Sequence, residues 1–168
     1  MTGGFFVEPL TSRDRADFSC GVPALDRYLR EQASQDTKRL MASCFLILEK
    51  DTAKIAGYYT LAATSVPAGE LPAEILRRLP RYPTLPAALV GRLAIDHRFH
   101  GKGLGSALVA DAALRVLRGD TKAFALIVDA KDDGALAFYR HLGFMPLASR
   151  PMSLFLTIAT ALKGAATP

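Results

Sequence analysis

The sequence lacks the features that mark several classes of protein. It has only two cysteines, Cys20 and Cys44, in 168 residues, and their spacing is neither that of metal ligands nor a C-x-x-C motif. It has no run of the roughly 18 apolar residues that a membrane span needs, and its start, MTGGFFVEPL, resembles no signal peptide. We therefore expect a cytoplasmic protein without a membrane partner, a metal site or a disulfide framework, in which both cysteines are buried thiols.

The chain also lacks internal repeats, low-complexity tracts and linkers. Half of its composition is hydrophobic, which is enough for a packed core. These features predict a single domain over residues 1–168.

Positive charge is concentrated in one part of the chain. The totals are 21 Lys and Arg against 16 Asp and Glu, and residues 75–102 hold six of the basic residues against Asp96 alone. A local basic excess indicates an anionic partner such as phosphate or nucleic acid, although a solvated basic face would have the same composition.

Hydrophobic periodicity predicts a chain that alternates between helices and strands. The expected helices cover 20–36, 72–79, 104–117 and 133–142, the last stopped by Gly143; a hairpin covers 43–63, and strands cover 88–96, 123–130, 144–148 and 152–159. The prolines of PRYPTLPA, residues 80–87, predict a loop without regular structure. This order corresponds to a mixed α/β or α+β fold.

Three glycines stand where the helix after residue 103 should begin. Gly101, Gly103 and Gly105 alternate in HGKGLGSAL, and residues 100–107 contain no acidic residue but include Lys102. Glycine costs a helix about 1 kcal/mol relative to alanine, but it lets an anion approach the unpaired amides of the first turn. The spacing fits neither a Walker loop nor a dinucleotide fingerprint, while a tight strand-to-helix turn would explain one or two of the glycines.

The strand LVGRLAID followed by HGKGLGSAL resembles motif A of the GNAT superfamily of N-acetyltransferases, [QR]-x-x-G-x-[GA], with His100 where Gln or Arg is usual. In that motif, loop amides hold the pyrophosphate of acetyl-CoA. The resemblance implies that acetyl-CoA is bound by the strand backbone and the loop, namely by Leu93, Ala94, Ile95, Arg98, His100, Gly101, Lys102, Gly103, Leu104, Gly105 and Ser106.

A second segment, DDGALAFYRHLGF, resembles motif B of the same superfamily, N-x-x-A-x-x-[FL]-Y-x-x-x-G-F, with Asp132 in place of the Asn. It implies that Asp132, Ala135 and Phe138 also belong to the cofactor site, and that Tyr139 is the catalytic group that assists the departing thiolate. From the sequence alone, Phe138 is most simply a core residue and Tyr139 a packing residue. The implied GNAT fold is a central, mostly antiparallel mixed sheet, flanked by helices and splayed at the acetyl-CoA site.

No general base stands out, since Asp96, His97 and Asp129 are candidates by location only. A lysine amine, with a pKa near 10.4, would need such a base, whereas an α-amine near 7.7 to 8.0 is already about one tenth neutral at pH 7. The sequence therefore favours an α-amine as the acetyl acceptor. Arg92, inside an apolar strand, is expected either to bind an anion or to pair with Asp96 or Asp129.

The N-terminal part narrows the resemblance. FSCGVPALDRYLREQASQDTKR, IAGYYTLAATSV and LVGRLAID are together similar to the GNAT toxins of bacterial type II toxin–antitoxin modules. This similarity implies acetylation of the α-amine of aminoacyl-tRNA, inhibition of translation, a ribbon-helix-helix antitoxin and a homodimer. The candidate tRNA contacts are Lys38, Arg39, Arg77, Arg78, Arg81 and Arg92.

Two other functions remain compatible with the sequence. One is a GNAT N-acetyltransferase that acts on a protein N-terminus or a small-molecule amine. The other is a regulatory module that binds acyl-CoA without catalysis, in which Tyr139 has only a packing role.

Overall fold

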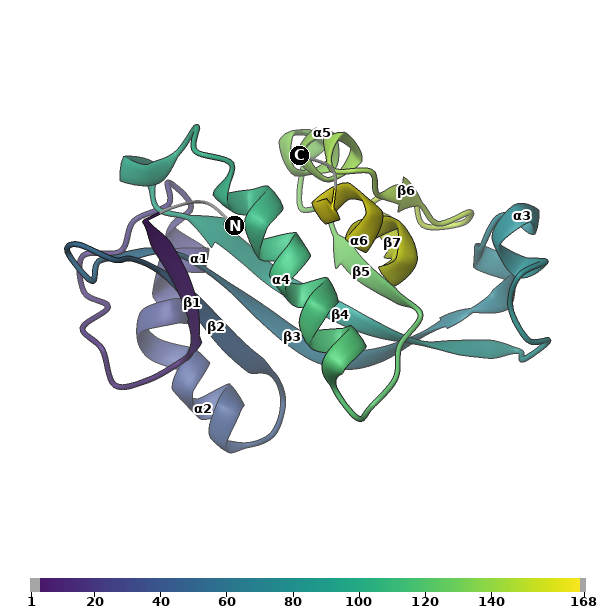
Figure 1. Ribbon diagram of the computed structural model, residues 1–168, viewed down its shortest axis with the longest axis horizontal. Helices are drawn as coiled ribbons and strands as arrows, with labels where there is room; N and C mark the ends of the chain where they lie inside the picture. The colour runs from purple at the N-terminus through teal and green to yellow at the C-terminus, as the bar shows by residue number, and fades with distance from the viewer. Residues whose placement is uncertain (1–3, 167–168) are drawn as a thin grey trace. The chain divides into compact units, whose positions relative to one another are not determined.

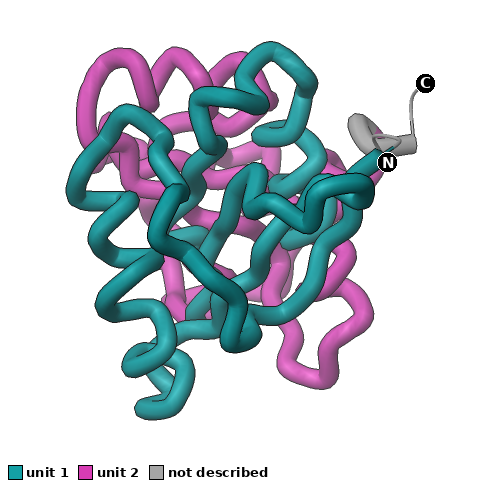
Figure 2. The backbone as a smooth tube through the Cα atoms, turned by 90° about the vertical axis from the view of Figure 1, so that its left-hand side faces the viewer, with its two compact units in different colours: residues 1–62, 90–112 teal, residues 63–89, 113–168 magenta. Residues whose placement is uncertain are grey.

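The computed structural model describes residues 4–166, and the side chains of residues 4–163. These residues divide into two compact units: one contains the chain up to residue 62 and residues 90–112, and the other contains residues 63–89 and those from 113 onward (Figure 2). Strands β3 (Ile55–Pro67) and β4 (Thr84–Ile95) and helix α4 (Leu104–Arg118) contribute residues to both units.

The strands follow the order β1-β2-β3-β4-β5-β7-β6 (Figure 1). On one side of the order, β2 (Ser43–Glu49) pairs antiparallel with both β1 (Phe5–Pro9) and β3. On the other side, β7 (Ser153–Thr157) pairs antiparallel with both β5 (Ala125–Asp129) and β6 (Met145–Pro146). Strands β4 and β5 pair parallel, with Ala87 opposite Ala125 and Leu89 opposite Ile127. The predicted mixed, mostly antiparallel sheet with helices is therefore confirmed.

In the first unit, a helical segment covers one face of the hairpin. It consists of α1 (Pro23–Arg27), the π-helical turns of η1 (Tyr28–Gln32) and α2 (Ala33–Lys38), and Pro23 stands in its first turn, where its missing amide proton costs nothing. Tyr28, Leu29 and Ala33 pack against alternate residues of β2, which are Cys44, Leu46 and Leu48. One side of the helical segment and alternate residues of β2 thus face the same core.

In the second unit, the core forms around β5, β7 and the chain between β3 and β4. Leu71, Leu85, Ile127, Leu147 and Phe155 are buried together there. The peripheral elements are η2 (Ala68–Glu70), α3 (Ala73–Leu76), α5 (Asp133–His141) and α6 (Ile158–Ala166).

The structure corrects several local predictions. Thr84–Ala87 lie in β4, although PRYPTLPA was expected to be a loop. Pro86 comes just before the residues of β4 that pair with β5, and its carbonyl accepts a hydrogen bond from the Phe124 amide at 3.0 Å. Strand β1 and helix α6 were not predicted. Cys20, expected to be buried, is only half-buried in the turn before α1. Leu117, in the last turn of α4, is 51% exposed although it is apolar.

No helix within residues 4–166 combines the length and the hydropathy required to cross a bilayer. The described side chains also contain no cluster of three or more His, Cys, Asp or Glu residues arranged to hold a metal ion.

Candidate functional site

The glycine loop leads into a helix whose first turn has amides without partners in the helix and contains no acidic residue. Gly101 and Gly103 have φ of 78° and 75°, which side-chain-bearing residues rarely adopt, and α4 begins at Leu104. A Cβ added at either glycine would meet no atom within 4 Å, so the backbone there is exposed. The amides of Leu104, Gly105 and Ser106 precede the first bond of the helix, from Ala107 to the Gly103 carbonyl at 3.1 Å, and the first turn has no acid.

A fully buried carboxylate holds the chain just before this loop. Asp96 accepts hydrogen bonds from the Ser19 amide at 3.0 Å, from the Arg98 amide at 2.9 Å, and from Arg98 Nε at 2.8 Å and Nη2 at 2.9 Å. Burial by itself would raise the pKa of Asp96, but these donors outweigh it and lower the pKa to about 2. Asp96 is therefore an anion that ties the N-terminal segment to the loop.

The side chains that flank the loop are occupied by contacts within the protein. Besides Asp96, Arg98 contacts Asp17 at 3.3 Å. His100 donates from Nε2 to the Ile95 carbonyl at 2.8 Å, and His97 donates from Nδ1 to the Ser19 carbonyl at 2.8 Å. Lys102 is exposed and forms no ion pair with the described carboxylates. Of the predicted cofactor ligands, Arg98 and His100 thus have structural partners, and any contact of theirs with a cofactor stays a prediction.

The strand predicted to line the acetyl group lies against a glycine that the sequence reasoning did not single out. A Cβ at Gly57 of β3 would come within 2.7 Å of the Ala94 carbonyl oxygen and of the Ile95 side chain, so only glycine fits there. Leu93 and Ile95 are half-buried and Ala94 is buried. The sequence contained one signal of this close approach, the glycine before the two tyrosines in IAGYYTL.

Tyr139 is positioned by the end of α5. Gly143 has φ of 101°, its amide donates to the Arg140 carbonyl at 3.0 Å, and the Phe144 amide donates to the Tyr139 carbonyl at 3.1 Å. This is a Schellman cap, which requires a glycine-like backbone at Gly143 and places Phe144 against the last turn. The Phe144 ring accordingly packs edge-on against Tyr139, with their centroids 5.4 Å apart.

The hydroxyl of Tyr139 has no protein partner among the described side chains, although only 8% of the residue is exposed. Burial raises the pKa of Tyr139 to about 12. A buried hydroxyl normally finds a hydrogen-bond partner. Tyr139 therefore offers a neutral, protonated donor to an external group.

The other residues predicted on this helix have distinct environments. Asp132 is the N-cap of α5, where it accepts from the Ala135 amide at 2.8 Å, as the capping position requires. Ala135 is half-buried. Phe138 is 38% exposed, so its interpretation as a core residue is wrong, whereas its assignment to the cofactor site stays a prediction.

The three general-base candidates each have a structural partner. Asp96 and His97 are bonded as described above, and Asp129 accepts from the Ser153 hydroxyl at 2.6 Å. The protein therefore presents no uncommitted base among them, in agreement with an acceptor that needs none.

Arg92 is held by an aromatic ring instead of an acid. Its guanidinium carbon lies 3.7 Å from the centroid of the Tyr28 ring, and the Tyr28 hydroxyl donates to Asp36 at 2.7 Å. Neither Asp96 nor Asp129 pairs with Arg92, so of the two alternatives for Arg92 the ion pair with these acids is excluded, and the binding of an anion stays a prediction. A cation held on a ring keeps its donors available for an anion.

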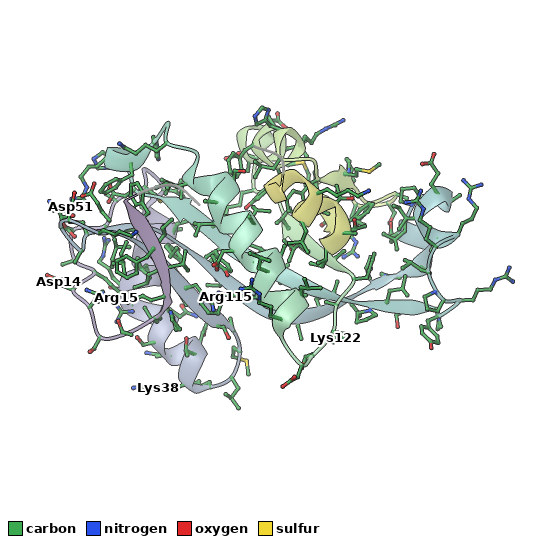
Figure 3. All side chains as sticks on the ribbon, in the orientation of Figure 1. Asp14, Arg15, Lys38, Asp51, Arg115 and Lys122 are labelled. Carbon is green, nitrogen blue, oxygen red and sulfur yellow. The ribbon has the colours of Figure 1, made fainter. Side chains whose placement is uncertain are left out.

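The remaining candidate tRNA contacts are exposed, and none forms an ion pair with the described carboxylates. Lys38 is the last residue of α2, with Arg39 as its C-cap, and Figure 3 labels Lys38 there. Arg77, Arg78 and Arg81 belong to the other unit, after α3.

Comparison with known proteins gives one family. Residues 41–146 match the acetyltransferase (GNAT) domain family. The chain is 35% identical to a tRNA-acetylating toxin of Mycobacterium tuberculosis, over 88% of both chains. It is 29% identical to the probable toxin TacT of Sinorhizobium fredii, over 92% of this chain and 91% of that protein.

Solved structures agree in fold over nearly the whole chain. A tyrosine-to-phenylalanine mutant of KacT matches with a TM-score of 0.85 at 28% identity, covering 95% of this chain and 98% of that one. AtaT complexed with acetyl-methionyl-tRNAfMet matches with a TM-score of 0.83 at 27% identity, covering 96% and 99%. An AtaT mutant bound to the C-terminus of the antitoxin AtaR gives 0.78 at 25% identity, covering 98% and 99%.

Proposed function

The chain belongs to the acetyltransferase (GNAT) domain family, and on that premise we propose that it transfers an acetyl group from acetyl-CoA to the α-amine of aminoacyl-tRNA, thereby inhibiting translation. The observation that carries this proposal is the 35% identity to a tRNA-acetylating toxin over 88% of the chain. The glycine loop and the unpartnered Tyr139 hydroxyl supply the groups that such a transfer needs.

The glycine loop has the chemistry required to hold a pyrophosphate. The first-turn amides of α4 lack partners within the helix, the turn contains no acid, and Gly101 and Gly103 leave the backbone uncovered. These amides would bind the phosphates of acetyl-CoA, and the backbone of Leu93, Ala94 and Ile95 would line the pantetheine and acetyl groups.

Tyr139 assists the leaving group in this account. The neutral α-amine attacks the thioester carbonyl carbon, a C–N bond forms, the C–S bond breaks, and the proton of the amine passes to water. With its pKa near 12, Tyr139 keeps its own proton and stabilises the departing thiolate by donating a hydrogen bond to the sulfur.

The partners and organisation form part of the same proposal. The structural similarity to AtaT bound to the C-terminus of the antitoxin AtaR supports an antitoxin as the partner of this chain, and from the resemblance to GNAT toxins we infer that it is of the ribbon-helix-helix type. We further infer a homodimer, a cytoplasmic location and a single acetyltransferase domain of residues 1–168. The family match, over residues 41–146, includes residues of both compact units.

Growth and translation test the proposal in cells. Induction of the wild type is expected to arrest growth and to stop incorporation of labelled amino acids, whereas Tyr139→Phe permits both. The double variant Arg77→Glu, Arg78→Glu should lose tRNA acetylation but still bind acetyl-CoA, because those arginines would meet the tRNA phosphates. Normal growth with the soluble wild type would contradict the proposal, and joint loss of both functions in the double variant would give Arg77 and Arg78 a structural role.

A further inference from the structure

A surface tyrosine stands among arginines in a loop that the sequence interpretation treated only as a source of charge. Tyr82 is 60% exposed, and its side chain has no ring contact or hydrogen bond within the described part of the chain. Arg77, Arg78 and Arg81 precede it, all exposed. We refer to residues 77–83 as the arginine turn.

The arginine turn is fixed at both ends, so its exposed side chains are presented by a defined backbone. Leu79 packs against the core of its unit, and the Leu79 amide donates to the Leu76 carbonyl at 3.1 Å. The Tyr82 amide donates to the Pro80 carbonyl at 2.9 Å, and the Pro83 carbonyl accepts from the Ala68 amide at 3.0 Å. Pro80, between these anchors, and Pro83 itself further restrict the backbone.

We propose that the Tyr82 ring stacks on an unpaired base of the RNA substrate, while the three arginines contact its phosphates. Sequence-tolerant binding of single-stranded nucleic acid combines these two features, an aromatic face for a base and cations for the backbone. The inference rests on the proposed function and adds to it a residue that positions the unpaired part of the tRNA.

The composition of the surface favours RNA over an acidic protein segment. Protein hot spots also use Tyr and Arg, but they lie in well-packed, desolvated pockets ringed by contacts that exclude water. Within residues 63–89, Tyr82 is the sole large hydrophobic side chain that is strongly exposed. The Tyr82 ring stands alone among arginines that form no ion pair with the described carboxylates. This arrangement fits a nucleotide, which offers a planar base and a charged phosphate, better than it fits an apolar protein surface.

Fluorescence gives a direct test, because the chain contains no tryptophan. Tyr82→Trp in the full chain places the sole indole in the arginine turn, where base stacking should quench it. We expect saturable quenching by deacylated tRNA and by a ten-nucleotide single-stranded RNA, and much less by the blunt duplex of the same sequence. Leu117→Trp, at a residue 51% exposed on α4, is the matched control and should change little.

Equal quenching at both positions, or none at position 82, would overturn the inference. Quenching of Tyr82→Trp by polyglutamate and not by single-stranded RNA would assign the arginine turn to an acidic protein partner and would equally overturn it.

Kinetics separate this inference from the proposed function. Tyr82→Ala should raise the KM for charged tRNA by about 5- to 150-fold, the range that one stacked base contributes, with kcat and the KM for acetyl-CoA unchanged. Tyr82→Phe, which keeps the aromatic face, should stay close to wild type. If the wild type acetylates charged tRNA and Tyr82→Ala has a normal KM, the inference fails alone. If the wild type acetylates no tRNA and Tyr82→Trp is still quenched by single strands, the proposed function fails alone.

Discussion

The glycine loop and helix α5 present their functional groups in opposite ways. Around the loop, Asp96, His97, Arg98 and His100 all form contacts within the protein, and what remains available is the backbone amides and the exposed Lys102 side chain. On α5, the backbone is closed by a Schellman cap, and the available group is one side-chain hydroxyl, that of Tyr139. Binding by the loop therefore depends on backbone shape, whereas the chemistry on α5 depends on a single atom.

The largest effect should come from removing that atom. Tyr139→Phe is expected to lower kcat by about 10²- to 10⁴-fold without changing the KM for acetyl-CoA, because the hydroxyl acts only on the leaving thiolate. Steady-state kinetics on charged tRNA measure both parameters.

Tyr58→Phe is the matched control for this prediction. The Tyr58 hydroxyl is also buried, but it donates to the Leu25 carbonyl at 2.6 Å, so its loss should lower the melting temperature and spare kcat. Equal kcat values for wild type and Tyr139→Phe would return Tyr139 to a packing role.

Removing the charge of Asp96, which holds the chain before the glycine loop, should lower the stability of the fold more than it lowers the rate of acetyl transfer. Asp96→Asn should destabilise the fold by about 2 kcal/mol at pH 7, because a buried carboxylate with charged donors is lost. Since the pKa of Asp96 is lowered to about 2 in the folded protein, its contribution is present above its unfolded pKa of about 3.9 and is lost as the pH falls toward 2.

Urea unfolding at pH 7 and at pH 3 measures this dependence. The stability gap between wild type and Asp96→Asn should narrow at the lower pH. A gap of the same size at both pH values would show that the charge of Asp96 is not the source of the stabilisation.

Changing backbone shape should have a smaller effect, confined to binding. Gly103→Ala forces alanine to adopt a φ of 75°, at a cost of about 1 to 2 kcal/mol, and should weaken acetyl-CoA binding several-fold in calorimetry. Gly21→Ala carries similar strain, at a φ of 91° with no atom near the added Cβ, but lies outside the loop. The two variants should lose similar stability while only Gly103→Ala binds acetyl-CoA less tightly. Equal affinities would separate the loop from cofactor binding.

The smallest effect is expected from pH. Because the pKa of Tyr139 is raised to about 12, its proton should remain in place through pH 9.5. The rate should therefore rise as the α-amine loses its proton, at or below a pKa of about 8, and then stay level. Initial rates on charged tRNA, corrected for spontaneous deacylation, test this; a fall near pH 9 that Tyr139→Phe abolishes would contradict the raised pKa.

The sequence was informative where one local rule determines the structure. The glycines before α4, Gly101 and Gly103, have positive φ angles that few other residues adopt, so the loop was predictable. Gly143 and Phe144 form the cap that ends α5, and this cap also requires a positive φ, so the end of α5 was predictable too. Two β-rich runs about a polar turn similarly located β2 and β3, and a continuous apolar run located β5.

Features that depend on distant segments were not predictable. Asp96 is bonded to Ser19, 77 residues away, and nothing in the spacing of LAIDHRF indicates that partner. Arg92 contacts the Tyr28 ring, which belongs to the helical segment that packs on the hairpin. From the sequence, Asp96 and Asp129 were the candidate partners of Arg92. Strand β1 forms by pairing with β2, a segment more than 30 residues away in the chain, and Pro86 lies in β4 just before the residues that pair with the distant β5.

The most direct measurement is acetyl transfer from labelled acetyl-CoA to a total pool of charged tRNA, with deacylated tRNA and Tyr139→Phe as controls. We predict label on charged tRNA alone, released with the aminoacyl group on mild alkaline hydrolysis and absent with Tyr139→Phe. Binding of acetyl-CoA with no label on charged tRNA, together with acetylation of free peptides or small amines, would contradict it.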